Sequence, residues 1–343
     1  IIGRHSFELC SRPRIISSAS YVGDKEGKGP LRECFDKICR DDTLGLDSWE
    51  QAESRMFESA VRVALAKIKR QSDDLSCLLG GDLLNQIISS GFAAREIRAP
   101  FIGLYGACST ISEGLMLGGM LVDGGFAELA ACAASSHFSA AERQFRYPLE
   151  MGVQAVPSSQ RTVTGAGSII IQAAGEFRPG AGNVFEHVAL TGGTIGSVED
   201  FGITDANNMG AAMAPAAFKT IKTHLSDYSR RVEDYDRIIT GDLGIFGSDM
   251  LYELLRGEGI EIADRHEDCG KLMFSPEQNV NCGASGCGCA ATVMSSWFLP
   301  KIESGEIRRV LFLATGALMS PVSSLQGESI PSIAHAVVIE HID

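Results

Sequence analysis

Cys108 is the residue of this sequence that is best placed to do chemistry. It follows a short apolar run at residues 101–105 and the dipeptide Gly106-Ala107, and a predicted helix begins directly after it. The unpaired N–H groups and the positive dipole end of a helix N-terminus favour a thiolate and bound anions. The turn therefore predicts a nucleophile or the wall of an anion-binding pocket, with a buried structural cysteine as the alternative.

Carboxylates and histidines near other predicted strand ends are further candidates. Asp82 and Asp242 each follow an apolar strand in the tripeptide Gly-Asp-Leu, where aspartate caps a turn or orients water or calcium. His137 follows the strand predicted near residues 128–134, and His335 precedes the last strand. Each histidine is predicted either to line a pocket or to be structural.

The elements that must position these residues occur twice. An acidic turn, an apolar strand and Gly-Asp-Leu appear at residues 72–83 and again at 232–243, an offset of 160. Residues 106–109 and 283–286 each open a helix of small residues, and the strands near 128–133 and 168–172 correspond to 310–315 and 336–340. Strands that alternate with helices predict a duplicated α/β layer structure rich in parallel strands.

Other segments have simpler predictions. Residues 1–47 are predicted to be an irregular lead-in, and Ser48 is predicted to cap an amphipathic helix that extends to about residue 70. Residues 135–162 are predicted to form a long polar loop.

Composition narrows the class of protein. The chain has 343 residues, of which 45% are hydrophobic and 21% charged, so a large core is expected. A net charge of −13 argues against a nucleic-acid partner. Ten irregularly spaced cysteines are typical of a reducing compartment. Neither a signal peptide nor a transmembrane segment is apparent, and we expect a soluble protein.

The duplicated unit with a strand–Gly-Ala-Cys-Ser–helix turn resembles the thiolase superfamily, which includes the ketoacyl-synthase condensing enzymes. The resemblance implies an α/β fold of two βαβαβαββ halves in five layers, α-β-α-β-α, and a homodimer. It implies halves at residues 1–178 and 179–343, the first of which includes the lead-in and the 135–162 loop. It also implies that Cys108 occupies the nucleophile position.

The chain departs from the catalytic pattern of that superfamily at three positions. Val280 stands where thiolases have a histidine, Asp242 where the synthase branch has one, and Ser332 near the second thiolase cysteine. Condensation needs groups that move protons and hold an oxyanion, so we expect a protein that is not an enzyme. Asn281 is a remaining oxyanion donor, and an acyl-thioester condensing enzyme that uses Cys108 stays the alternative.

A closer resemblance, to the stage V sporulation protein AD family, extends over essentially the whole chain. The segments that carry it are residues 81–86, 106–110, 135–137, 141–148, 202–205, 213–217 and 333–335. The resemblance implies binding of dipicolinic acid (pyridine-2,6-dicarboxylate) and a part in its uptake into the developing spore. It further implies other stage V membrane proteins as partners, a place at the periphery of the inner forespore membrane, and no cofactor beyond calcium that accompanies dipicolinate.

Dipicolinate is a flat dianion, so its site needs cations or helix N-termini for two carboxylates and an apolar slot for the ring. Arg143 and Arg146, with Phe145 and Tyr147 between and beside them, are predicted to supply the cations and a ring contact, or else to form surface ion pairs. The full set of candidate ligand-binding residues is Cys108, Ser109, Thr110, His137, Arg143, Arg146, Asp82, Asp242, Asn281 and His335.

Overall fold

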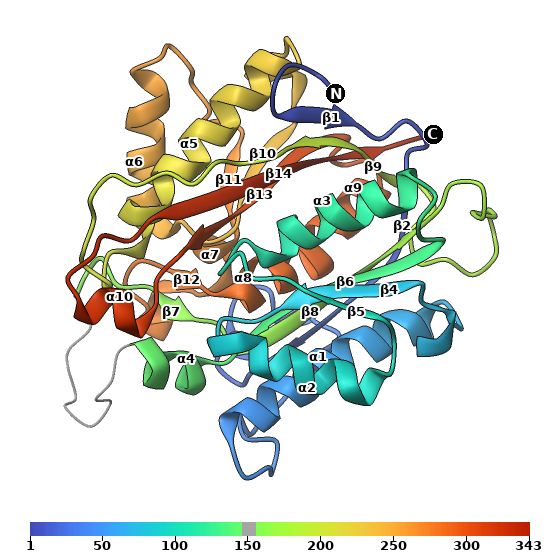
Figure 1. Ribbon diagram of the computed structural model, residues 1–343, viewed down its shortest axis with the longest axis horizontal. Coiled ribbons are helices and arrows are strands. Elements are labelled where there is room, and N and C mark those ends of the chain that lie inside the picture. The colour runs from blue at the N-terminus through green and yellow to red at the C-terminus, as the bar shows by residue number, and fades with distance from the viewer. Residues whose placement is uncertain (146–155) are drawn as a thin grey trace.

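The main sheet has twelve strands, and its two halves, here called the first and the second sheet, meet where β2 pairs with β9 (Figure 1). The computed structural model describes residues 1–145 and 156–343. The first sheet contains β2 (Arg14–Val22), β8 (Gly165–Gln172), β6 (Leu129–Ser136), β4 (Cys77–Gly81) and β5 (Phe101–Gly103), in that order. The second contains β9 (Val188–Thr194), β14 (Ser332–His341), β13 (Arg309–Ala317), β10 (Arg237–Thr240) and β11 (His266–Asp268). One residue pair, Arg14 and Ala189, joins them.

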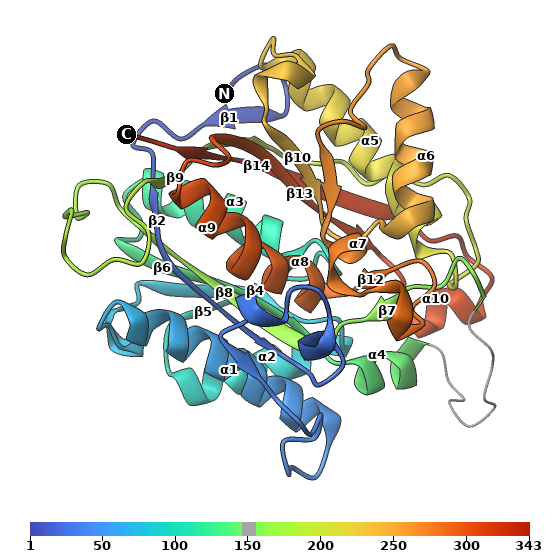
Figure 2. The same cartoon turned by 180° about the vertical axis from the view of Figure 1, so that it is seen from behind.

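Helices lie outside both sheets and between them, which gives five layers (Figure 2). The outer layer on the first sheet consists of α1 (Trp49–Lys67) and α2 (Ile88–Ile97). The outer layer on the second consists of α5 (Met209–Asp227) and α6 (Gly244–Arg256). The middle layer contains α3 (Thr110–Asp123) and α8 (Cys287–Val293), which continues into a π-helical turn (Met294–Phe298) and α9 (Leu299–Glu303).

The strand pairings repeat between the two sheets, as the duplicated sequence predicts. In the first sheet β4 pairs in parallel with β5 and β6, and β8 pairs antiparallel with β6 and β2. In the second, β10 pairs in parallel with β11 and β13, and β14 pairs antiparallel with β13 and β9. The predicted thiolase-like fold is confirmed, whereas the exact boundary at residue 178 stays a prediction.

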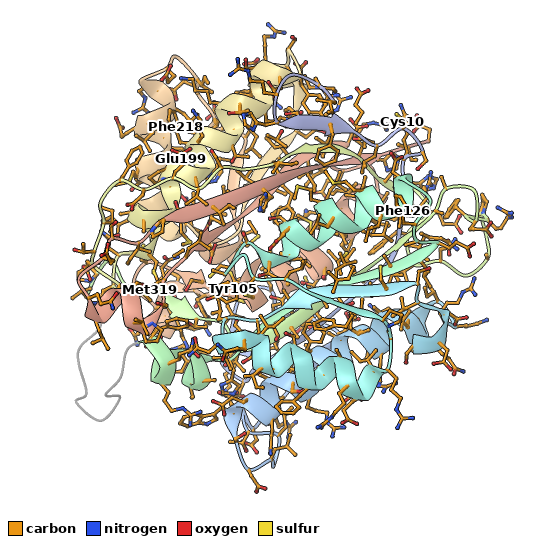
Figure 3. All side chains as sticks on the ribbon, in the orientation of Figure 1. Cys10, Tyr105, Phe126, Glu199, Phe218 and Met319 are labelled. Atoms are coloured by element: carbon orange, nitrogen blue, oxygen red, sulfur yellow. The ribbon has the colours of Figure 1, made fainter. Side chains whose placement is uncertain are left out.

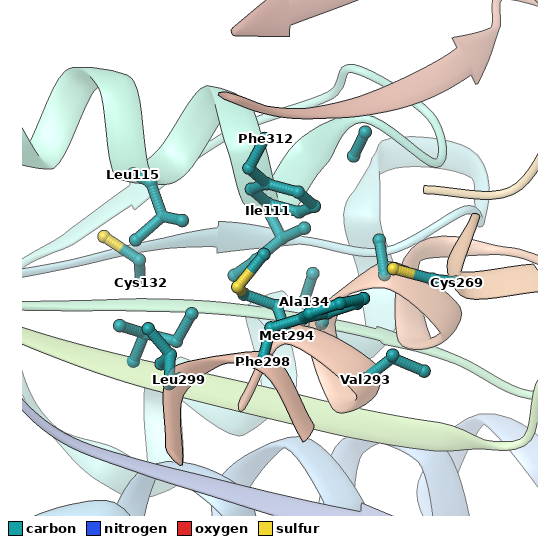
Figure 4. Close-up of a cluster of buried hydrophobic side chains, with 14 of the residues drawn as sticks. Ile111, Leu115, Cys132, Ala134, Cys269, Val293, Met294, Phe298, Leu299 and Phe312 are labelled. Atoms are coloured by element: carbon teal, nitrogen blue, oxygen red, sulfur yellow. The ribbon is translucent and has the colours of Figure 1, made fainter. Parts of the chain in front are cut away.

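The core between the sheets draws on both halves of the chain (Figure 4). Ile111 and Leu115 of α3 pack in one buried cluster with Cys132 of β6, Phe298 of the π-helical turn and Phe312 of β13. Because these side chains interlock across the middle layer, the loops of the two halves are held in fixed positions at the site.

The prediction of an irregular segment over residues 1–47 is wrong, because β2 runs through the centre of the molecule. Its sequence is rich in serine, and the hydroxyl groups are satisfied locally. Ser17 Oγ donates to the Ala64 carbonyl and Ser18 Oγ to the Ser295 carbonyl, both at 2.7 Å. A strand buried through such hydrogen bonds lacks the apolar alternation by which strands are recognised. Ser48, by contrast, caps α1 as predicted, and its side chain accepts from the Gln51 amide.

The predicted loop at residues 135–162 contains two regular elements. Helix α4 (Phe138–Phe145) follows β6, and β7 (Arg161–Thr162) pairs in parallel with β12 (Ala284–Ser285) of the second half. In α4, residues 138, 141, 142 and 145 share one face, since residues three and four apart are neighbours on a helix. Both elements turn out to border the site. Among the described residues, no helix combines the length and apolar character needed to span a bilayer.

Candidate functional site

The turn that carries Cys108 is held by hydrogen bonds within itself. Ala107 adopts a left-handed conformation with φ of 49°. The amides of Ser109 and Thr110 donate to the carbonyls of Gly106 and Ala107, at 3.0 and 3.2 Å, and their hydroxyls donate to the same carbonyls at 2.7 Å. Ser109 and Thr110 therefore build the turn, and these two amides are not unpaired donors aimed at a ligand.

A cavity of about 40 Å³ lies directly beside Cys108. Its lining is mostly apolar and comes from both halves of the chain: Leu83, Tyr105, Ala107, Cys108, Ala141, Glu142, Phe145, Thr162, Met209, Met213, Ser285, Ala317 and Met319. Tyr105 and Met319, which are labelled in Figure 3, come from opposite halves and both line this cavity. The Thr162 and Ser285 pair comes from the short β7–β12 ladder.

The Cys108 thiol faces the carboxyl group of Asp242 instead of a histidine. Burial raises the pKa of Cys108 well above its ordinary value, and the Asp242 carboxylate raises it further. Burial also raises the pKa of Asp242 to about 7, against the opposing effect of hydrogen bonds from Cys108 and Thr315. The Asp242 carboxyl accepts from Thr315 Oγ1 at 2.8 Å and from the Gly286 amide at 3.2 Å.

These surroundings overturn the expectation of a thiolate at position 108. Desolvation of a fully buried sulfur outweighs the field of the helix end, so the proton stays on Cys108. Asp242, one of the predicted candidates, follows β10 and lies behind Cys108, outside the cavity lining. Its contact with Cys108 joins the two halves at this point.

The two candidate histidines form hydrogen bonds with neighbouring backbone groups. His137 is 1% exposed, its Nε2 lies 2.9 Å from the Asp42 carbonyl, and its Nδ1 accepts from the Ser139 amide. His335 accepts from the Gly196 amide at 3.2 Å, and burial lowers its pKa to about 4. Neither side chain is among the described residues that line the cavity, so the contacts of both are those of structural histidines.

Asp82 organises the start of α2, close to the cavity wall at Leu83. Its carboxyl accepts from the Leu84 amide at 2.8 Å and from the amide and hydroxyl of Ser90 at 2.8 and 2.7 Å. Glu53 of α1, which sequence reasoning missed, is buried nearby, and burial followed by the Asp82 charge raises its pKa. The one signal in the sequence is that Glu53 falls on the apolar face of the amphipathic helix α1, where a charged residue is unexpected.

The predicted arginine pair is not assembled around the cavity. Arg143 forms an ion pair with Glu50 and its guanidinium lies 5.2 Å from the ring centroid of Trp49, on a different face of α4 from the cavity-lining residues. Arg146 lies outside the described residues. Asn281 is exposed and donates to the Val156 carbonyl at 3.0 Å. The ligand-binding roles of these residues stay predictions.

Comparison with known proteins places the chain in a family. The sequence profile of stage V sporulation protein AD matches residues 3–340. Stage V sporulation protein AD of Bacillus subtilis (strain 168) is 44% identical over 326 residues, which are 95% of this chain and 94% of that protein. The chain belongs to the stage V sporulation protein AD family. It is therefore a sporulation protein, as its sequence motifs predict.

Solved structures similar to this member of the stage V sporulation protein AD family are thiolase-like. Human mitochondrial 3-ketoacyl-CoA thiolase in complex with CoA is 11% identical with a TM-score of 0.59, over 99% of this chain and 100% of that one. A variant of OleA from Xanthomonas campestris bound with cerulenin is 13% identical with a TM-score of 0.60, over 96% of each chain. At these identities the likeness concerns the fold alone.

Proposed function

We propose that this chain is a non-catalytic thiolase-fold protein that binds dipicolinic acid and takes part in its uptake into the developing spore. The observation that carries the proposal is the cavity beside Cys108, which keeps an opening for a ligand while the sulfur faces a carboxyl group. A histidine or a positive neighbour favours a nucleophilic thiolate, whereas the Asp242 carboxyl raises the pKa of Cys108.

The apolar part of the cavity lining can receive a flat ring. Tyr105 is 45% exposed at its edge, Phe145 is half-buried, and Met209, Met213 and Met319 supply adaptable apolar surface. A volume of about 40 Å³ is smaller than the roughly 150 Å³ cavity that holds benzene. The pyridine ring is therefore expected at the mouth, between Tyr105 and Phe145, with Thr162 and Ser285 available as hydrogen-bond donors.

The same proposal covers the cellular setting. A protein of this kind would act at the periphery of the inner forespore membrane with other stage V membrane proteins, as a homodimer. Calcium that accompanies dipicolinate would arrive with the ligand. Among the described residues, no group of three or more His, Cys, Asp or Glu side chains is arranged to hold a metal ion.

Dipicolinate is expected to bind the purified protein and to raise its melting temperature, because a ligand that binds only the native state stabilises it by mass action. Picolinate, which lacks one carboxylate, is expected to bind more weakly. Calorimetric titration with both acids, together with melting curves, measures the difference. Equal affinity for the two acids would remove the two-carboxylate site, and no heat or shift with either would remove the proposed function.

The alternative, an acyl-thioester condensing enzyme, is favoured by one observation. Cys108 lies on a tight turn with the left-handed Ala107 before it, directly ahead of α3. We expect no thiolysis or condensation of acetyl-CoA or acetoacetyl-CoA above background, since the sulfur keeps its proton and no histidine lines the described part of the cavity. Turnover that disappears in Cys108→Ala would establish the enzyme and refute the non-catalytic proposal.

A further inference from the structure

The described lining of the Cys108 cavity carries no positive charge. It includes no lysine, arginine or histidine, and Glu142 is the one side chain of the described lining with a carboxyl group. The proposed ligand is a dianion, because carboxyl groups with an ordinary pKa of about 4 are ionised at neutral pH. The charge state of the groups directly behind this lining therefore affects how well two carboxylates are accommodated.

Asp242 lies behind the lining, in contact with Cys108. Its side chain is fully buried, and its carboxyl accepts hydrogen bonds from the Cys108 thiol and the Thr315 hydroxyl. A third hydrogen bond comes from the Gly286 amide. Because Cys108 itself lines the cavity, only this one residue separates the carboxyl from a bound ligand. Two like charges at such a separation repel each other more strongly inside a protein than in water.

The described titratable groups that face Asp242 are all acidic. They are the Asp268 carboxyl of β11, the Cys108 thiol, the Cys269 thiol of α7, and the Cys287 and Cys289 thiols of α8. The other contacts, from Thr315 of β13 and the Gly286 amide, are neutral donors. Burial, with a smaller effect of the Asp268 charge, raises the pKa of Asp242 to about 7. The carboxyl is therefore neutral in mildly acidic solution and ionised in mildly alkaline solution.

A second pair of buried carboxyl groups belongs to Glu53 and Asp82, next to the lining residue Leu83. Burial raises the pKa of both, and the Asp82 charge raises that of Glu53 further. Ionisation of either group would repel a bound anion in the same sense as ionisation of Asp242. A change of Asp242 alone isolates the contribution of the carboxyl that touches Cys108.

We propose that binding of the dicarboxylate is linked to a proton on Asp242, so that the site accepts the anion while this carboxyl is neutral and disfavours it once the carboxyl is ionised. The inference rests on the proposed function and adds to it a control by pH. The free protein holds this proton below about pH 7, so the affinity is highest there and falls as pH rises. Near pH 7 the protein takes up a proton from solution as the ligand binds.

The test is calorimetric titration with dipicolinate from pH 6 to 8, in buffers of different ionisation enthalpy that report proton uptake. One linked group with a pKa of about 7 makes the affinity fall about 10-fold over this range, with uptake of about half a proton per ligand at pH 7. Picolinate carries one carboxylate, is repelled less, and should lose less affinity. A pH-dependent change in the shape of the cavity would weaken both acids equally and would overturn the inference.

Three variants assign the proton to its residue. Asp242→Asn cannot ionise and should show a smaller fall in affinity and less proton uptake than wild type. Thr315→Val removes the hydroxyl that donates to the carboxylate at 2.8 Å, so the fall should move to higher pH. Asp73→Asn, at an exposed carboxyl, is the matched control and should behave like wild type. Melting curves establish that each variant is folded, and the direction of the Thr315→Val shift decides if Asp242→Asn does not fold.

The outcomes separate this inference from the proposed function. If wild type binds dipicolinate with constant affinity from pH 6 to 8 and takes up no proton, the inference is wrong and the proposed function stands. The same holds if folded Asp242→Asn keeps the full pH dependence and proton uptake of wild type. If wild type binds neither acid at any pH in this range, both the inference and the proposed function are wrong.

Discussion

Replacement of Cys108 by Trp is expected to abolish dipicolinate binding, whereas Cys108→Ser should bind within several-fold of wild type. Serine is nearly isosteric and still donates a hydrogen bond to Asp242. An indole at this position fills a cavity of only about 40 Å³ and reaches its mouth. We expect a loss of more than roughly 100-fold for Trp, which corresponds to about 2.7 kcal/mol of binding free energy.

Calorimetric titration measures both affinities, and melting curves control for folding. An added ring in a packed wall destabilises by about 1–3 kcal/mol, so the Trp variant should melt lower but remain cooperative. The same two variants also separate wall from nucleophile, because a nucleophilic sulfur would make Cys108→Ser as damaging to function as Cys108→Trp. Undiminished dipicolinate binding by folded Cys108→Trp would place the ligand elsewhere and remove Cys108 from the site.

A second large effect is expected from Asp242→Asn, and it depends on pH. The pKa of Asp242 is about 7 in the folded protein and 3.8 without the fold. Between these values the unfolded chain loses the proton while the folded protein keeps it, so this group makes the free energy of unfolding fall as pH rises from about 4 to 7. The total contribution is on the order of 4 kcal/mol, and it is complete above pH 7.

Asparagine does not ionise, so the variant loses this part of the pH dependence. At pH 5 Asp242→Asn should be less stable than wild type, since one of the contacts to Thr315, Gly286 or Cys108 is mismatched. Towards pH 8 its stability relative to wild type should improve by about 2–4 kcal/mol. Urea unfolding at both pH values measures this change, with the exposed Asp73→Asn as control. Parallel pH profiles for wild type and Asp242→Asn would refute a protonated Asp242 beneath Cys108.

The duplication and the turn that carries Cys108 were predictable from the sequence, because the first is periodic and the second is a local motif. Gly-Asp-Leu at residues 81–83 and 241–243 follows equivalent strands, β4 and β10, in the folded protein. The Cys108 turn comes between β5 and α3, as the run from apolar residues to Gly-Ala-Cys-Ser indicates. The resemblance to the thiolase superfamily, which implies the fold, rests on these two features together.

The rest depends on contacts that no local pattern reports. The helix start at Cys108 predicts a thiolate, but burial and the approach of Asp242 from the other half reverse that expectation. The central strand β2 was not predicted, because its serines break the apolar alternation. Their hydrogen bonds to the carbonyls of Ala64 and Ser295 make their burial possible.

A structure of the protein crystallised with saturating dipicolinate tests the central claim most directly, since it reports where the ligand lies and what it touches. We predict a pyridine ring at the mouth of the cavity beside Cys108, between Tyr105 and Phe145, with no covalent bond to sulfur. Dipicolinate bound at another surface, or absent from this cavity in crystals of protein that binds it in solution, would contradict the account.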